Sequence, residues 1–122
     1  MHRASQQPPI AYRGRRTDAG AVVEAESPAG IWHELDPRLD LRNHSPTGFE
    51  WGFGGSGPAQ LALALAASRL PDATAPAIYQ HLKRTLVAGL DRHRWQLSGD
   101  ALDEQLVKLL SANIADDLQR PR

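Results

Sequence analysis

The stretch that decides the fold of this chain is His44-Ser-Pro-Thr-Gly-Phe-Glu-Trp-Gly-Phe-Gly-Gly-Ser-Gly-Pro-Ala-Gln60. It holds five of the ten glycines and runs directly into Leu-Ala-Leu-Ala-Leu, which is typical of a helix. A glycine-rich turn before a helix leaves backbone N–H groups unpaired and pointing the same way, which suits a bound anion. The same turn can simply need positive φ angles, which glycine adopts at little cost. The sequence is compatible with both interpretations.

An anion or nucleotide at this helix start would need the loop amides and a nearby cationic side chain. The candidate residues are Arg13, His44, Glu50, Trp51, Gly54, Gly55, Ser56, Gly57 and Gln60. The loop lacks the Lys-Ser/Thr of a P-loop, and its glycines do not follow the dinucleotide-binding pattern. The alternative is a tight turn that lets the helix pack closely, with the aromatic residues at 49, 51 and 53 sealing the core rather than stacking on a ligand.

Other chemistries find little support in the sequence. Gly54-Gly55-Ser56-Gly57 matches only part of the nucleophile elbow Gly-X-Ser-X-Gly, so we assign no catalytic residue. His33, Asp36, Asp40 and His44 are metal-ligand types at loose spacing, and we assign no metal or other cofactor. The chain has no cysteine, which excludes disulfides and a thiol nucleophile.

The charge pattern bears on possible partners. The formal net charge is zero, whereas proteins that bind duplex DNA are usually basic, so nucleic acid is possible but not favoured. The basic segment 91–95 either contacts nucleic acid or is a solvated helix end with Trp95 packed inward. No apolar run approaches the length of a membrane span and no secretory signal is visible, so we expect a cytoplasmic protein without membrane contact.

Hydrophobic patterning predicts an α+β fold, in which a small antiparallel sheet from the N-terminal third packs against three C-terminal helices. Segments 10–14 and 21–25 form a hairpin, 31–35 is a third strand or extended segment, and 49–51 is a last short strand. The helices cover 58–70, 76–90 and 99–118. Gly57 caps the first helix, which is apolar on several sides and is expected to be central and buried. Residues 10–118 form one domain between flexible tails at 1–9 and 119–122.

The chain also resembles a known family. The resemblance rests on Tyr12-Arg-Gly-Arg15, Val22-Val23 and the run from His44 to Leu65, and it extends from about residue 10 to residue 97. The family is a domain-of-unknown-function family of small bacterial and phage proteins, often carried on mobile elements. Phe53 stands where the family more often has Tyr, which argues against a Tyr-dependent chemistry there. The resemblance implies a mobile-element context and no particular reaction.

Two functions of different class follow. The first is a non-enzymatic binding or adaptor protein of a phage or mobile element, which contacts a host or phage macromolecule; we expect that macromolecule to be a protein. The second is a binding protein or enzyme that takes a nucleotide or small anion at the glycine-rich turn.

Overall fold

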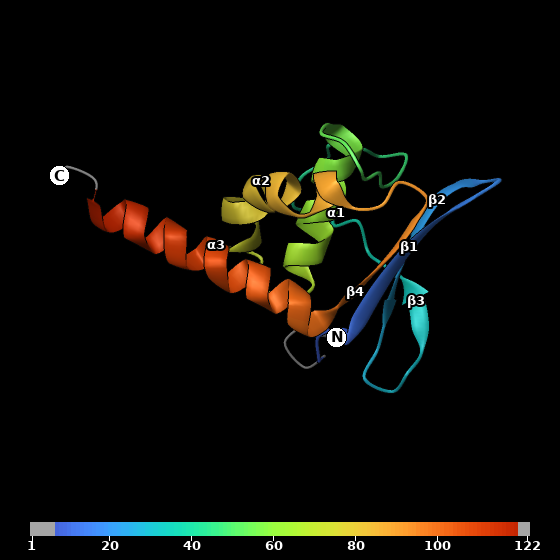
Figure 1. The fold of residues 1–122 in the computed structure, drawn as a ribbon, viewed down its shortest axis with the longest axis horizontal. Helices are drawn as coiled ribbons and strands as arrows, with labels where there is room; N and C mark the ends of the chain where they lie inside the picture. The colour runs from blue at the N-terminus through green and yellow to red at the C-terminus, as the bar shows by residue number, and fades with distance from the viewer. Residues whose placement is uncertain (1–6, 120–122) are drawn as a thin grey trace.

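The computed structural model describes residues 7–119, and it describes the side chains as far as residue 113. These residues form an α+β fold with four strands and three α-helices, which confirms the predicted class (Figure 1). The elements in chain order are β1 (Ala11–Thr17), β2 (Gly20–Glu26), β3 (Trp32–Glu34), α1 (Ser56–Ala67), α2 (Ala75–Thr85), the 3-10 helix η2 (Val87–Gly89), β4 (Arg94–Ser98) and α3 (Gly99–Gln119).

The sheet is antiparallel throughout, with the strand order β3-β2-β1-β4. β1 and β2 form the predicted hairpin, closed by a turn between Thr17 and Gly20, and β3 confirms the predicted third strand. β1 is the strand around which the sheet is built, because it pairs with β2 on one side and with β4 from the distant C-terminal part on the other. The helices lie to one side of the sheet (Figure 1).

β4 corrects the sequence analysis, which had interpreted its first residues as a helix end. The segment Arg-Trp-Gln-Leu-Ser alternates polar and apolar residues, the period of a strand with one buried face. Trp95 is buried, as predicted, although in a strand, and Leu97 packs against the core beside it. The strand predicted at 49–51 is wrong: Phe49 and Trp51 are buried in an irregular segment that pairs with no strand.

α1 is the centre of the core, as predicted. Every residue from Pro58 to Ala67 is buried, including Leu61, Leu63 and Leu65, so the helix is covered around its circumference. The structure corrects its ends: it begins at Ser56 with Gly55 as the N-cap, and it ends at Ala67. α2 packs along α1 and ends at Thr85, after which the chain tightens into η2 instead of continuing to residue 90.

α3 begins where β4 ends, and its far end extends beyond the rest of the domain (Figure 1). The hydroxyl of Ser98 accepts the N–H of Ala101 at 3.0 Å and so caps the start of α3. In the described part of the chain, no helix is both long and apolar enough to cross a membrane. Of the two predicted tails, residues 1–6 and 120–122 lie outside the described residues. Pro9 is held to the domain by a hydrogen bond from Arg69 to its carbonyl oxygen.

Candidate functional site

Gly55 and Gly57 are two of the positions around the start of α1 that need glycine. Gly55 has a φ of 140°, a conformation that residues with a Cβ rarely adopt. Gly57 has Glu50 packed directly on it, so that a Cβ at Gly57 would lie 2.6 Å from the Cβ of Glu50. A Cβ at Gly54 would meet nothing within 4 Å. The glycines at 55 and 57 are therefore required by backbone shape and close packing.

Glu50 places an acidic group of the chain itself beside the start of α1. Its carboxylate accepts a hydrogen bond from Arg16 at 2.8 Å, and the same guanidinium donates to the carbonyl oxygen of Arg92 at 2.7 Å. The guanidinium also lies over the ring of Trp51, 4.6 Å from its centroid. A carboxylate near a helix N-terminus is itself stabilised by the helix dipole, so Glu50 competes with an external anion.

Arg16 and Arg92 are the residues here that the sequence analysis missed. Arg13 was the expected cation, but it forms its contacts on the opposite face of β1. Side chains alternate along a strand, so the residue three positions later, Arg16, points to the loop side. This two-residue alternation of side chains was the signal in the sequence that could have identified Arg16.

The side chains of Gln60 and His44 both form hydrogen bonds within the chain. The buried amide of Gln60 accepts the N–H groups of His44 and Ser45 at 2.8 and 3.1 Å. It donates to the carbonyl oxygens of Pro37 and Arg42 at 2.6 and 3.0 Å. The Gln60 amide therefore holds the irregular segment before α1 in place. The ring of His44 is hydrogen-bonded to the Tyr79 hydroxyl at 2.6 Å.

The three aromatic residues of the loop divide between core and surface. Phe49 and Trp51 are buried, and Trp51 stacks edge to face on Trp95 at 5.8 Å. Phe53 is 42% exposed and lies over Gly55, where a Cβ would be 3.6 Å from the Phe53 ring. The loop thus offers one exposed ring next to a turn whose neighbouring side chains, Glu50, Gln60 and His44, are hydrogen-bonded within the chain.

Arg13 belongs to the outer face of the sheet, the face turned away from α1. On this face Arg13 lies opposite Glu24 of β2 and Gln96 of β4. It donates to Glu24 at 3.0 Å, and its guanidinium lies 3.9 Å from the centroid of the Trp32 ring. Arg13 therefore forms a surface cluster with Glu24 and Trp32, at a different place from the glycine-rich loop.

A shallow hollow of about 590 Å³ lies on β1 and β4. We call it the arginine hollow; its residues are Arg13, Gly14, Arg15, Arg94, Trp95 and Gln96. Arg15 and Arg94 lie directly opposite each other in the strand register, although like charges at such positions are unfavourable. Arg13 and Arg15 share Glu24, at 3.0 and 3.7 Å, while among the described residues Arg94 forms no ion pair. In the part of the chain that the structure describes, the three guanidinium groups of the arginine hollow thus have one carboxylate partner, Glu24, which Arg13 and Arg15 share.

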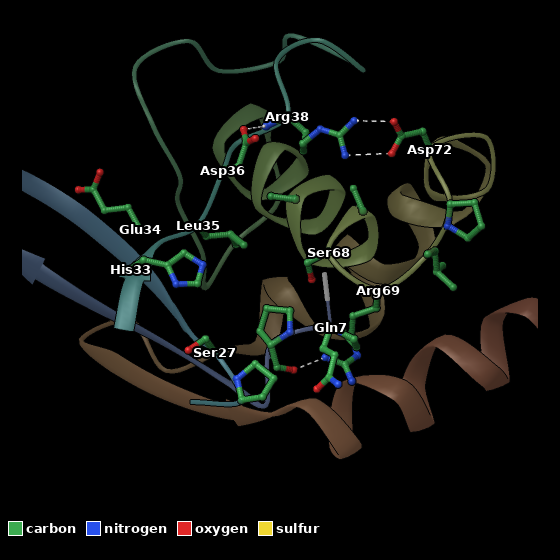
Figure 2. A pocket seen from close by; sticks show the side chains of 17 residues that line it. Gln7, Ser27, His33, Glu34, Leu35, Asp36, Arg38, Ser68, Arg69 and Asp72 are labelled. Carbon is green, nitrogen blue, oxygen red and sulfur yellow. Dashed lines mark hydrogen bonds and ion pairs between the residues drawn. The ribbon is translucent and has the colours of Figure 1, made fainter. Parts of the chain in front are cut away.

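A second hollow, a groove of about 1190 Å³, runs between the C-terminal end of α1, the segment around β3 and the chain at Gln7 to Pro9 (Figure 2). Its lining includes Leu35, Ala64 and Ala67, and His33 points toward it (Figure 2). Its two arginines are engaged: Arg38 binds Asp40 and Asp72, and Arg69 binds Asp103.

Arg38 is a buried cation in a left-handed backbone conformation with a φ of 57°. Its guanidinium donates to both carboxylate oxygens of Asp72, at 3.0 and 2.9 Å, and to both of Asp40, each at 3.0 Å. These hydrogen bonds hold the pKa of Arg38 above its ordinary value. This clamp ties the segment after β3 to the turn between α1 and α2.

Tyr12 and Arg69 form a second buried network beneath β1. The Tyr12 hydroxyl lies 2.6 Å from the hydroxyl of Ser68, and burial raises the pKa of Tyr12. Burial opposes the charge on Arg69, but hydrogen bonds with Asp103 and Tyr12 outweigh it and raise the pKa of Arg69. The bond from Arg69 in turn lowers the pKa of Asp103. Within the described residues, no group of three or more His, Asp or Glu side chains could hold a metal ion.

Comparison with known proteins identifies the family. A family model described as a family of unknown function, DUF6166, matches residues 12–108. The chain belongs to DUF6166. No curated protein and no solved structure matches it. The region matched by DUF6166 contains the glycine-rich loop, the buried networks and the arginine hollow.

Proposed function

We propose that this DUF6166 protein is a non-enzymatic binding protein that contacts a macromolecule through the arginine hollow. The observation that carries the proposal is the excess of positive charge there: Arg13 and Arg15 share one carboxylate, and Arg94, directly opposite Arg15, forms no ion pair with a described residue. An acidic partner would relieve this repulsion. The side chains around the glycine-rich loop support a binding role over a catalytic one, because His44, Glu50 and Gln60 are bonded within the chain.

The rest of the outer face favours a protein as the partner. Glu24 and Glu34 are direct cross-strand neighbours on β2 and β3, and Glu26 lies on the same face. A phosphate backbone laid across the sheet would meet these carboxylates, whereas an acidic protein segment can be confined to β1 and β4. The resemblance to phage and mobile-element proteins implies that the partner is a phage or host protein, met in the cytoplasm.

The proposal is tested by the binding of poly-L-glutamate to the purified protein at low salt. The test variant replaces Arg13, Arg15 and Arg94 by Ser. A matched control replaces three exposed cations elsewhere, Arg42, Arg84 and Lys108, by Ser and so has the same net charge. We expect the test variant to bind about tenfold more weakly or worse and the control to bind within about threefold of wild type.

Equal losses in both variants would contradict the proposal, because binding would then depend only on total charge. A separate arm titrates inorganic phosphate and nucleotides. If they stabilise wild type and Arg16→Ser removes the effect, the site is the start of α1 instead.

A further inference from the structure

The free edge of β4 adds a second recognition element to the arginine hollow. β4 is an outermost strand, and among the described strands it pairs with β1 alone. The Gly99 N–H donates to the carbonyl oxygen of Ile10 at 2.8 Å, which fixes the alternation of hydrogen bonds between the two strands. By this alternation the backbone groups of Trp95 and Leu97 face β1, and those of Arg94, Gln96 and Ser98 face away from the sheet.

Part of this edge is already closed. Asp91 accepts the Arg94 N–H at 3.3 Å, so the chain caps the first outward donor of β4 itself. The N–H and carbonyl of Gln96 follow in the middle of the strand, and Gln96 and Ser98 are both exposed. The opposite edge of the sheet, β3, has only three residues, a length that discourages pairing. β4 is therefore the edge better suited to receive another strand.

We propose that β4 binds an extended segment of a partner protein as a fifth strand, and that this segment alternates acidic and apolar residues. The proposal rests on the proposed function, since it assigns the binding mode and chemistry of the same surface. A strand beside β4 places every second side chain on the outer face next to Arg94 and Gln96, within reach of Arg15. Acidic residues fit these positions.

The intervening side chains of the added strand point to the other face of the sheet. There they lie next to Trp95 and Leu97. Of these two residues, Leu97 is only half-buried. Apolar residues fit these positions. Backbone hydrogen bonds to Gln96 would supply affinity, and the alternating side chains would supply specificity, as in other cases of strand addition.

Two other occupants fit less well. A nucleic acid has no backbone that completes a β-ladder, and Glu24 and Glu34 lie further along the same face. A second copy paired through β4 would place two arginine hollows side by side and increase the repulsion that the hollow already contains. Both are retained as outcomes of the test.

The experiment uses 15N-labelled full-length protein and the synthetic peptide acetyl-(Glu-Val)3-amide, with acetyl-(Lys-Val)3-amide and oligo-dT as comparison ligands. Gln96→Pro removes the outward N–H without removing a bond to β1. Gln96→Ala is the matched control, since it keeps the N–H and removes the side chain. We expect Gln96→Pro to bind the acidic peptide about tenfold more weakly than Gln96→Ala, or worse, because the two variants both lack the side chain and differ in the outward N–H.

Amide exchange in wild type gives a second readout that does not depend on the folding of the proline variant. The acidic peptide should slow exchange at Gln96 and Ser98. Peptide binding by Gln96→Pro equal to wild type, unchanged exchange at both amides, or binding of oligo-dT without binding of the peptide would each overturn the proposal. So would dimerisation of wild type that Gln96→Pro abolishes.

The two proposals fail separately. If strand addition is wrong but the arginine hollow binds acidic ligands, poly-L-glutamate binding still depends on Arg13, Arg15 and Arg94 and is unaffected by Gln96→Pro. If poly-L-glutamate does not depend on those arginines, the proposed function itself is wrong.

Discussion

The glycine-rich loop before α1 and the outer face of β1 and β4 differ in how their polar groups are used. In the loop, Gln60 makes four hydrogen bonds to backbone, and Glu50 is paired with Arg16. On the outer face, Arg13 and Arg15 share one carboxylate and lie beside Arg94. The loop stands out in the sequence because its closely packed backbone needs several glycines. The outer face carries the unbalanced charge, although its residues form an ordinary strand pattern.

The sharpest test of this comparison sets two glutamines against each other. Gln60→Ala should lower the free energy of unfolding by roughly 3 kcal/mol or more, because partly buried N–H and carbonyl groups of four residues lose their partner. Gln96→Ala, on the exposed outer face, should change it by no more than about 0.5 kcal/mol. Urea denaturation measures both. Similar values for the two variants would mean that the loop does not depend on the Gln60 amide.

Glycines within the loop give the next largest effect. Gly57→Ala should cost roughly 1–3 kcal/mol, because the new methyl group would collide with the side chain and backbone of Glu50. Gly54→Ala should be close to neutral, since the space around it is open. Thermal melts of the two variants decide the matter. A Gly54 variant that melts well below the Gly57 variant would contradict the described packing.

The burial of Tyr12 on the inner face of β1 predicts that the stability of the fold depends on pH. Burial raises the pKa of Tyr12 in the folded protein, so the folded state resists loss of this proton. The stability linked to Tyr12 is fully present below the ordinary tyrosine pKa of about 10 and is lost as the pH rises through the higher folded pKa. Tyr12→Phe should therefore flatten the alkaline decline in stability, measured by urea denaturation from neutral pH upward. An equally steep decline in the variant would assign it to other groups.

The smallest effects are expected for two consecutive arginines that point to opposite faces of β1. Arg16→Ser removes the contacts with Glu50 and Trp51 and should cost about 0.5–1 kcal/mol. Arg15→Ser should be neutral or slightly stabilising, within about 0.5 kcal/mol, because it removes the like-charge pair with Arg94. Chemical denaturation at low and high salt measures both. A larger loss for Arg15→Ser would mean that the arginine hollow serves stability.

Local patterns predicted most of the fold. The hairpin, the third strand, the three helices and the burial of α1 all follow from hydrophobic spacing and from good helix formers. The sequence analysis did not predict β4, because its five residues belong to and follow the basic segment 91–95. They form a strand only by pairing with β1, some eighty positions earlier in the chain. The ends of α1 were displaced because the sequence does not reveal that Gly55, rather than Gly57, adopts the unusual φ.

The candidate surface was less accessible to sequence reasoning. Arg13 was singled out for its place in the family pattern, but its expected neighbour was the glycine-rich loop. Only the strand register shows that Arg13, Arg15 and Arg94 meet on one face. The four backbone partners of Gln60 are similarly distant in sequence, so that no local rule connects them.

The central position of β1 has a consequence for the newly made chain. Its second partner, β4, ends at Ser98, so β1 keeps an open edge throughout synthesis until the ribosome has released almost the whole domain. Until then the inward side of Tyr12 lacks the neighbour Leu97, and the hairpin is exposed to pairing with other chains. A protein truncated before residue 94 would retain its glycine-rich loop and central helix and still be prone to aggregate.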